Sequence, residues 1–268
     1  MTTDAVTVAP TPVASARTHA VEDALTIAWR NLLNIRRNPQ LLVFATIQPV
    51  IFVLMFRYVF GGAIAVPGGS YINFLMPGIF VQTVVFGSLT TGVGLAEDLQ
   101  KGLIDRFRSL PMARSAVLVG RTLADLTRNV FVVILMCVVG VLVGWRPDGT
   151  ALEILAGVGI VLAFSYSLCW LFAIVGLTVR DSETAQAVSF PILAPLVFAS
   201  SAFVPVASMP DWLQVFAEHQ PVTFVVDAVR SLTLGHPSTH YIVGALLWIV
   251  GIIAVCAPIA VSRYRRAV

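Results

Sequence analysis

The chain has 268 residues, of which 57% are hydrophobic and only 12% are charged, whereas an average soluble domain carries about 25% charge. Its formal net charge of +3 is too small to indicate a nucleic-acid partner, and its mean hydropathy is +0.88. A water-soluble protein of this length has too little polar surface to cover so many apolar side chains. Composition therefore excludes an ordinary soluble domain and predicts one membrane-embedded domain.

The first 38 residues divide into two segments. Residues 1–20 are rich in Thr, Ala, Pro and Val without a helical period, which predicts a disordered cytoplasmic tail. In residues 21–38 apolar side chains recur at helical spacing and Pro39 follows, which predicts an amphipathic helix in the membrane interface. Its indole would lie at headgroup level and its guanidinium groups near anionic lipid: Trp29, Arg30, Arg36 and Arg37. An N-terminal extension of the first span is the alternative.

Residues 21–268, which include the interfacial helix, are predicted to form one transmembrane domain. A helix needs about 20 apolar residues to cross the hydrocarbon core. Six windows meet this requirement: 40–60, 72–95, 123–144, 154–178, 186–204 and 241–261. These runs are continuous and do not alternate, which excludes a membrane β-barrel. The predicted fold class is an all-α polytopic membrane protein with six transmembrane helices.

Residues 205–238 separate the fifth and sixth windows. They are too polar to span a bilayer, yet apolar side chains recur at helical spacing around 212–216 and 224–232. Pro205, Pro210 and Gly235 punctuate the segment. It therefore predicts two short outer helices that re-enter the outer leaflet.

The distribution of Lys and Arg predicts the orientation. Fourteen of the seventeen lie in the N-terminal segment, in the loops after the second and fourth spans, and at the C-terminus. The opposite side holds only Arg57, Arg146 and Arg230. Because basic loops stay on the cytoplasmic side, both termini are expected inside the cell.

The sequence contains none of the motifs that would give this chain chemistry of its own. GxxxxGK[ST], HExxH, GxSxG and clustered carboxylates are absent, so the sequence predicts no ATPase, no metal site and no cofactor in this chain. Cys137, Cys169 and Cys256 each lie in an apolar run and are expected to be small buried hydrophobic residues. A membrane-embedded enzyme is correspondingly disfavoured.

The polar stretch after the second span, EDLQKGLIDRFRSLPMARSAVLVGR at 97–121, contains a short amphipathic piece that Pro111 ends. A second helix then leads into the third span, and its base carries Arg121, Asp125 and Arg128 at a spacing that allows pairing along one face. Two interpretations remain open at this point. The stretch is either a solvated hairpin or a docking element for a cytoplasmic partner.

The sequence resembles the permease subunit of a type-2 ABC exporter, most closely the actinobacterial daunorubicin/doxorubicin-resistance type. The similarity lies in the run GLIDRFRSLPMARSAVLVGR, in the outer stretch SSAFVPVASMPDWLQVFAEHQPVTFVVDAVRSLTLG, and in the order of an amphipathic helix followed by six spans. It covers about residues 22–266.

The resemblance implies the partners. Two six-span permeases, identical or homologous, would pair in the lipid bilayer, and separate ATPase subunits carrying ATP and Mg would dock on the cytoplasmic side. The interfacial helix and the loop after the second span would contact the ATPases. In this sequence the loop residues are Glu97, Asp98, Leu103, Asp105, Arg106, Phe107 and Arg108.

The resemblance also implies a substrate pathway along the permease interface, lined by the second and fifth spans and closed by the outer helices. Hydroxyl, amide and aromatic groups on these spans suit a hydrophobic or amphipathic substrate, although helix packing uses the same residue types. The candidates are Phe80, Gln82, Thr83, Phe86, Phe190, Phe198, Ser200, Ser201 and Phe203.

The expected function is therefore that of a permease subunit exporting hydrophobic or amphipathic drugs, antibiotics or lipids. Export of a lipid-linked glycan or polymer by the same architecture is the alternative. An ATP-independent channel is a more remote one, because full charges are scarce in the middle of the spans.

Overall fold

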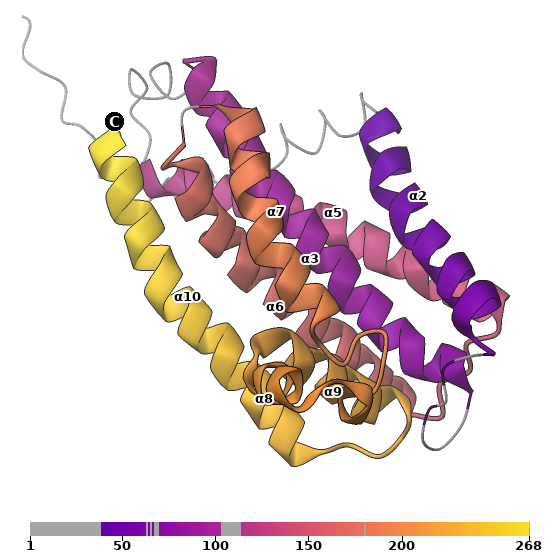
Figure 1. Cartoon of the computed structure of the whole chain (residues 1–268). Helices are drawn as coiled ribbons and strands as arrows, with labels where there is room; N and C mark the ends of the chain where they lie inside the picture. Colours follow the sequence, from indigo (N-terminus) through magenta and orange to yellow (C-terminus); the bar gives the residue numbers. More distant parts are fainter. Residues whose placement is uncertain are drawn as a thin grey trace, which may run out of the picture.

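The computed structural model describes residues 39–62, 64, 66, 70–102, 114–179 and 181–267. The expected tail and interfacial helix lie outside these residues, as does the hairpin segment 103–113. Within the described residues the chain is helical and contains no strand, which confirms the all-α class. Figure 1 shows the long helices side by side, with two short helices gathered at one end.

The helices follow the predicted windows closely in number and order. The elements are α2 (Pro39–Met55), the π-helical turn η1 (Phe56–Phe60), α3 (Tyr71–Gln100), α5 (Arg114–Val143), α6 (Ala151–Gly176), α7 (Ser182–Phe198), the 3-10 turn η2 (Val206–Ser208), α8 (Asp211–His219), α9 (Pro221–Thr233) and α10 (Thr239–Ala267). The two short outer helices predicted between the fifth and sixth windows are α8 and α9.

Four of the described helices are long and apolar enough to cross a membrane. They are α3, the Leu118–Val143 part of α5, α6, and the Thr239–Tyr264 part of α10. The first window forms a shorter apolar helix, and α7 has only 17 residues. Seventeen residues reach about 26 Å, at the lower limit of what spans a bilayer. The described residues therefore fit a polytopic membrane protein, with four helices that qualify as spans by length and composition.

The fifth window was predicted to continue to residue 204, and this boundary is wrong because α7 ends at Phe198. The backbone N–H of Ala199 still bonds the carbonyl of Pro195, but the hydroxyl of Ser200 donates to Val197 O and accepts from Ala202 N. Such local side-chain bonds replace the helical ladder and turn the chain.

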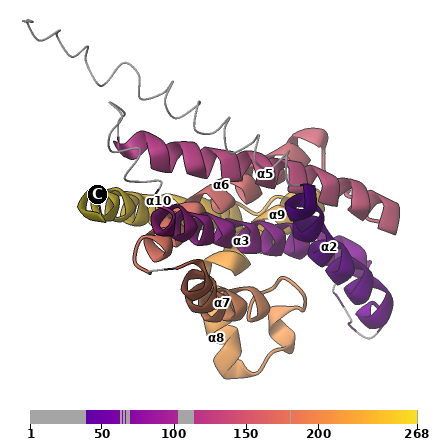
Figure 2. The same cartoon turned by 90° about the horizontal axis from the view of Figure 1, so that it is seen from above.

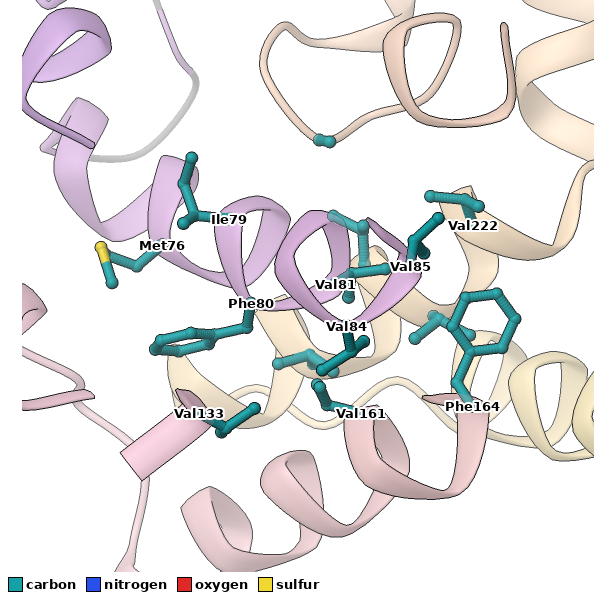
Figure 3. Close-up of a cluster of buried hydrophobic side chains, with 14 of the residues drawn as sticks. Met76, Ile79, Phe80, Val81, Val84, Val85, Val133, Val161, Phe164 and Val222 are labelled. Carbon is teal, nitrogen blue, oxygen red and sulfur yellow. The ribbon is translucent and has the colours of Figure 1, made fainter. Parts of the chain in front are cut away.

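Helix α3 lies at the centre of the bundle. Of its apolar window 72% is buried, against 28% for α5 and 17% for α10. Figure 3 shows Phe80 and Val84 of α3 facing Val133 of α5 and Val161 of α6. Seen from above, α5 and α7 lie on opposite sides of α3 (Figure 2). The exposed apolar faces of α5 and α10 suit contact with lipid or a partner helix.

Two glycines allow α3 and α6 to approach backbone to backbone. A Cβ on Gly176 would meet the carbonyl oxygen of Gly92, and a Cβ on Gly92 would lie 2.6 Å from the carbonyl oxygen of Phe172. Small residues at such crossings are typical of helix packing in membranes.

The bundle has two distinct ends, visible in Figure 1. At the hairpin end, where α3 ends and α5 begins, Leu95, Leu118 and Tyr264 share one apolar cluster. At the outer-helix end, where α8 and α9 lie, Arg146 N bonds Asn73 Oδ1 at 3.0 Å. The end of α10 therefore lies with the end of α3, as the predicted alternation of spans requires.

Candidate functional site

Four charged side chains near the hairpin end form a continuous chain of ion pairs, here called the charged ladder: Asp98, Arg121, Asp125 and Arg128. Arg121 Nη1 donates to Asp98 Oδ2 at 2.6 Å, and Arg121 Nε lies 3.8 Å from Asp125 Oδ2. Arg128 Nη1 lies 3.4 Å from Asp125 Oδ1. The predicted pairing along one face of the third span is thus confirmed.

The charged ladder is largely shielded from solvent, since its side chains are only 7% to 23% exposed. The signs alternate along the chain of pairs, so the group is neutral as a whole. A buried charge that loses its partner is costly, and this favours keeping the four residues together.

Hydrogen bonds tie the charged ladder to the neighbouring helix α3. Arg128 Nη2 donates to Gly87 O at 2.7 Å, and Thr91 Oγ1 donates to Asp125 Oδ2 at 2.7 Å. Next to Arg128, the Asn129 carboxamide donates Nδ2 to Ser165 Oγ of α6 at 2.6 Å. The polar group therefore joins α3, α5 and α6 at the depth where an apolar span was expected.

A cavity of about 150 Å³ lies at the deep end of the charged ladder, between α2, α3 and α5. Three predicted pathway residues line it, namely Gln82, Thr83 and Phe86. Arg128 and Asn129 line it as well. The side chain of Gln82 is buried, and its Oε1 has no hydrogen-bond partner.

The structure divides the remaining pathway candidates. Phe86 meets Phe190 with ring centroids 6.3 Å apart, which brings the second and fifth windows into contact. Phe80 instead packs edge-on against Trp145 in the core, at 5.3 Å, and is 2% exposed. Phe190 and Phe198 are 54% and 47% exposed, so both are open to lipid, substrate or another chain.

A second aromatic group forms where α7 ends. Phe203 stacks on Phe56 with centroids 4.6 Å apart and on Phe198 at 5.6 Å. Sequence reasoning included Phe198 and Phe203 but missed Phe56, which belongs to the first window. The only signal in the sequence was the four-residue spacing of phenylalanines at 52, 56 and 60.

A buried ion pair that sequence reasoning also missed lies at the outer-helix end. Arg230 pairs with Asp227 on α9, and Ser201 Oγ donates to Asp227 Oδ1 at 2.8 Å. Arg230 Nη2 donates to Ser201 O at 2.6 Å, and its guanidinium lies 3.7 Å from the ring centroid of Phe74. We call these four residues the outer clamp.

Electrostatics in the outer clamp follow from its burial. Desolvation raises the pKa of Asp227, while the charge of Arg230 and the bond from Ser201 oppose this rise. Desolvation lowers the pKa of Arg230 to about 10, so the guanidinium stays charged at neutral pH. Ser201 is thus bonded within the outer clamp, and the hydroxyl of its neighbour Ser200 donates to the backbone oxygen of Val197 at the turn.

The residues expected to contact an ATPase are described only in part. Asp98 belongs to the charged ladder, and Glu97 pairs with Lys101 on the exposed surface. Leu103, Asp105, Arg106, Phe107 and Arg108 lie outside the described residues, as do Trp29, Arg30, Arg36 and Arg37 of the interfacial helix. In the part of the chain that is described, no group of His, Cys, Asp and Glu is arranged to hold a metal ion.

The bundle is a polytopic membrane protein whose helices pack around a common core, and a buried polar group joins α3, α5 and α6. The family model of the ABC-2 type transporter matches residues 22–234. The chain belongs to the ABC-2 type transporter family.

Three relatives of the chain are named as permeases. The chain is 36% identical over 252 residues to a daunorubicin resistance ABC transporter permease of Streptomyces coeruleorubidus, covering 94% of this chain and 89% of the relative. It is 30% identical over 231 residues to a probable doxorubicin resistance ABC transporter permease of Mycobacterium tuberculosis, covering 83% and 81%. A putative transport permease of Porphyra purpurea is 24% identical over 214 residues, covering 78% and 73%.

Proposed function

We propose that this chain is the transmembrane permease subunit of an ATP-driven exporter that moves hydrophobic or amphipathic drugs, antibiotics or lipids out of the cell. A separate subunit hydrolyses ATP with Mg. The observation that carries the proposal is the 36% identity to a daunorubicin resistance permease over 94% of the chain. In this proposal α2 with η1 and α7 supply the first and fifth of six spans.

The hairpin end faces the cytoplasm in this proposal. Lys101, Arg121 and Arg128 lie in the elements that meet there, and Arg263 of α10 donates to Thr178 Oγ1 at 2.9 Å at the end of α6. Basic residues favour the cytoplasmic side of a membrane protein. Residues 103–113 would then project toward the ATPase, together with the interfacial helix at 21–38.

The charged ladder offers a route from the docking loop into the bundle. Asp98 lies at the end of α3, is itself one of the residues expected to contact the ATPase, and forms an ion pair with Arg121 of α5. Asp125 has Arg121, Arg128 and Thr91 as neighbours at 2.7 to 3.8 Å. Because Arg121 has one carboxylate on α3 and another on its own helix, it keeps Asp125 as a partner when α3 and α5 shift relative to each other. We assign the ladder a coupling role on this ground.

The substrate path is proposed to follow the face shared by α3 and α7. Phe86 and Phe190 meet there, and Phe198, which stacks on the buried ring of Phe203, continues the aromatic surface toward the outer-helix end. A second permease, identical or homologous, would complete this path. The outer helices α8 and α9, re-entering the outer leaflet, would help to close the exit.

The experiment is reconstitution of the chain with its ATPase subunit in lipid vesicles. We expect a stable complex whose ATP hydrolysis rises with an amphipathic drug such as daunorubicin, and no hydrolysis by the chain alone. Robust ATP hydrolysis by the purified chain would contradict the proposal. Stimulation by a lipid-linked glycan but not by drugs would favour the alternative substrate.

The docking loop can be tested in the same complex. Asp105→Ala and Arg106→Ala are expected to weaken ATPase docking or coupling. Arg146→Ala, an exposed arginine at the outer-helix end, is the matched control. Unchanged transport and unchanged complex stability in both loop variants would remove the loop from the proposal.

A further inference from the structure

The cavity between α2, α3 and α5 has polar side chains in its wall, and two of its hydroxyl groups present only acceptors. Thr83 Oγ1 donates its hydrogen to Ile79 O at 2.7 Å, and Thr90 Oγ1 donates to Gly87 O at 2.7 Å. A hydroxyl whose hydrogen is used in this way offers only lone pairs to a ligand. Both threonines therefore face the cavity as acceptors.

The donors of Arg128 and Asn129, in the same wall, are directed at protein atoms. Arg128 Nη2 donates to Gly87 O at 2.7 Å, and its Nη1 lies beside Asp125 at 3.4 Å. Asn129 Nδ2 donates to Ser165 Oγ at 2.6 Å. The charged ladder is also neutral as a whole, so the cavity does not call for an anion.

Gln82 is the group that points to a ligand. Its side chain is 3% exposed, it lines the cavity, and its Oε1 accepts no hydrogen bond. Leaving a buried acceptor unpaired is costly, and nearly all buried polar groups in proteins have a partner. The carboxamide of Gln82 therefore lacks a partner, and a polar group that enters the cavity can supply one.

The remaining wall is apolar, with Phe86, Pro49 and Val132 lining the cavity. Its volume of about 150 Å³ matches that of cavities that take up a single benzene ring. We propose that this cavity is a subsite for one ring of the transported substrate, and that it selects a ring bearing a hydroxyl or amine group, which hydrogen-bonds to the Gln82 carboxamide and donates to Thr83 Oγ1. The inference rests on the proposed export of amphipathic compounds and specifies how one part of them is recognised.

The test measures binding of two fluorinated probes of nearly equal size, 4-fluorophenol and 4-fluorotoluene. The full chain is embedded in lipid nanodiscs, binding is followed by ligand-observed fluorine NMR, and empty nanodiscs correct for partition into lipid. Because no ATPase is needed, the result does not depend on whether transport succeeds. We expect the phenol to bind about fivefold more tightly than the toluene, which corresponds to one net hydrogen bond.

Variants identify the acceptors. Gln82→Leu is expected to remove the preference for the phenol while fluorotoluene binding persists, which also shows that the variant is folded. Thr83→Val should reduce the preference in part, with little change in shape. Gln186→Leu, on the exposed surface of α7 and outside the cavity lining, is the matched control and should keep the wild-type preference.

Three results would overturn the proposal. They are equal affinity of the wild-type chain for both probes, saturable binding of neither, and an undiminished preference in both Gln82→Leu and Thr83→Val. If Gln82→Leu binds neither probe, the proposal is judged from the preference of the wild-type chain and from that of Thr83→Val. In that case, an unchanged preference in Thr83→Val counts against the site.

Discussion

The two ends of the bundle each bury arginine and aspartate, yet they hold them differently. In the outer clamp, Arg230 is fixed by a carboxylate, by the backbone oxygens of Ser201 and Phe74, and by an aromatic ring. In the charged ladder, Arg128 also bonds a backbone oxygen, but Arg121 lies between two carboxylates, Asp98 of α3 at 2.6 Å and Asp125 of its own helix at 3.8 Å.

This difference separates a rigid connection from one that can rearrange. Backbone acceptors and an aromatic face hold a guanidinium in one place, whereas charged side chains can exchange partners while their helices move. The outer clamp joins α9 to α3 and to the turn after α7. The charged ladder instead joins α3 and α5 next to the segment expected to meet the ATPase. We therefore expect both groups to contribute to stability, and only the charged ladder to contribute to coupling.

The largest expected effect is on stability, at the outer clamp. Arg230→Ala leaves Asp227 buried without its cation, which should destabilise the protein by about 3 to 5 kcal/mol. Thermal unfolding of the purified chain in detergent measures this. Arg146→Ala removes an exposed arginine at the same end and should cost less than about 1 kcal/mol. Equal unfolding temperatures for the two variants would show that the clamp is not a stabilising element.

The next effect concerns the close contact of α3 and α6. In Gly176→Ala the new methyl group meets the carbonyl oxygen of Gly92, so the helices must separate at a cost of about 1 to 3 kcal/mol. Gly159→Ala, in the same helix with open space around it, is the control and should be neutral or slightly stabilising. A similar loss of stability in both variants would mean that helix propensity, rather than the crossing, governs this region.

The charged ladder should affect coupling in addition to stability. Asp125→Asn keeps the shape but removes the charge that Arg121 and Arg128 share, and we expect coupling to fall by about 0.5 to 2 kcal/mol. Drug-stimulated ATP hydrolysis of the reconstituted complex should then fall roughly 2- to 30-fold, while basal hydrolysis persists. If Asp125→Asn lost as much stability as Arg230→Ala while drug stimulation of ATP hydrolysis stayed normal, the charged ladder would be a structural element without a coupling role.

The smallest effect is expected at the surface beside the charged ladder. Lys101→Ala breaks the exposed pair with Glu97, and exposed pairs at this helical spacing contribute little to stability because water and salt screen them. The unfolding temperature should match that of the wild type at both low and high salt. If Lys101→Ala lowered the unfolding temperature at low salt but not at high salt, the pair Lys101–Glu97 would have to be counted as part of the charged ladder.

Much of the fold was predictable because a bilayer imposes long apolar runs. The windows at 72–95, 154–178 and 241–261 lie within or nearly within α3, α6 and α10. Both outer helices were predicted from their apolar spacing. The end of α7 was not, because a hydropathy window does not register how Ser200 bonds the backbone around it.

The candidate site was predictable only where its residues share one helix. Arg121, Asp125 and Arg128 were recognised because their spacing alone allows pairing. Asp98 lies 23 residues from Arg121, and Ser201 lies 26 residues from Asp227, so these contacts depend on how helices pack. The cavity at Gln82 likewise exists only where three helices meet.

The central claim is that the hairpin end lies in the cytoplasm, where a separate ATPase can grip it, and that the outer helices lie outside. Labelling of single cysteines in spheroplasts by a membrane-impermeant maleimide tests it, with Cys137, Cys169 and Cys256 first replaced by Ala. Arg146→Cys, at an exposed polar position between α5 and α6 at the outer-helix end, should label in intact spheroplasts, and Lys101→Cys should label only after lysis. Labelling of Lys101→Cys in intact spheroplasts, with Arg146→Cys protected, would contradict the account.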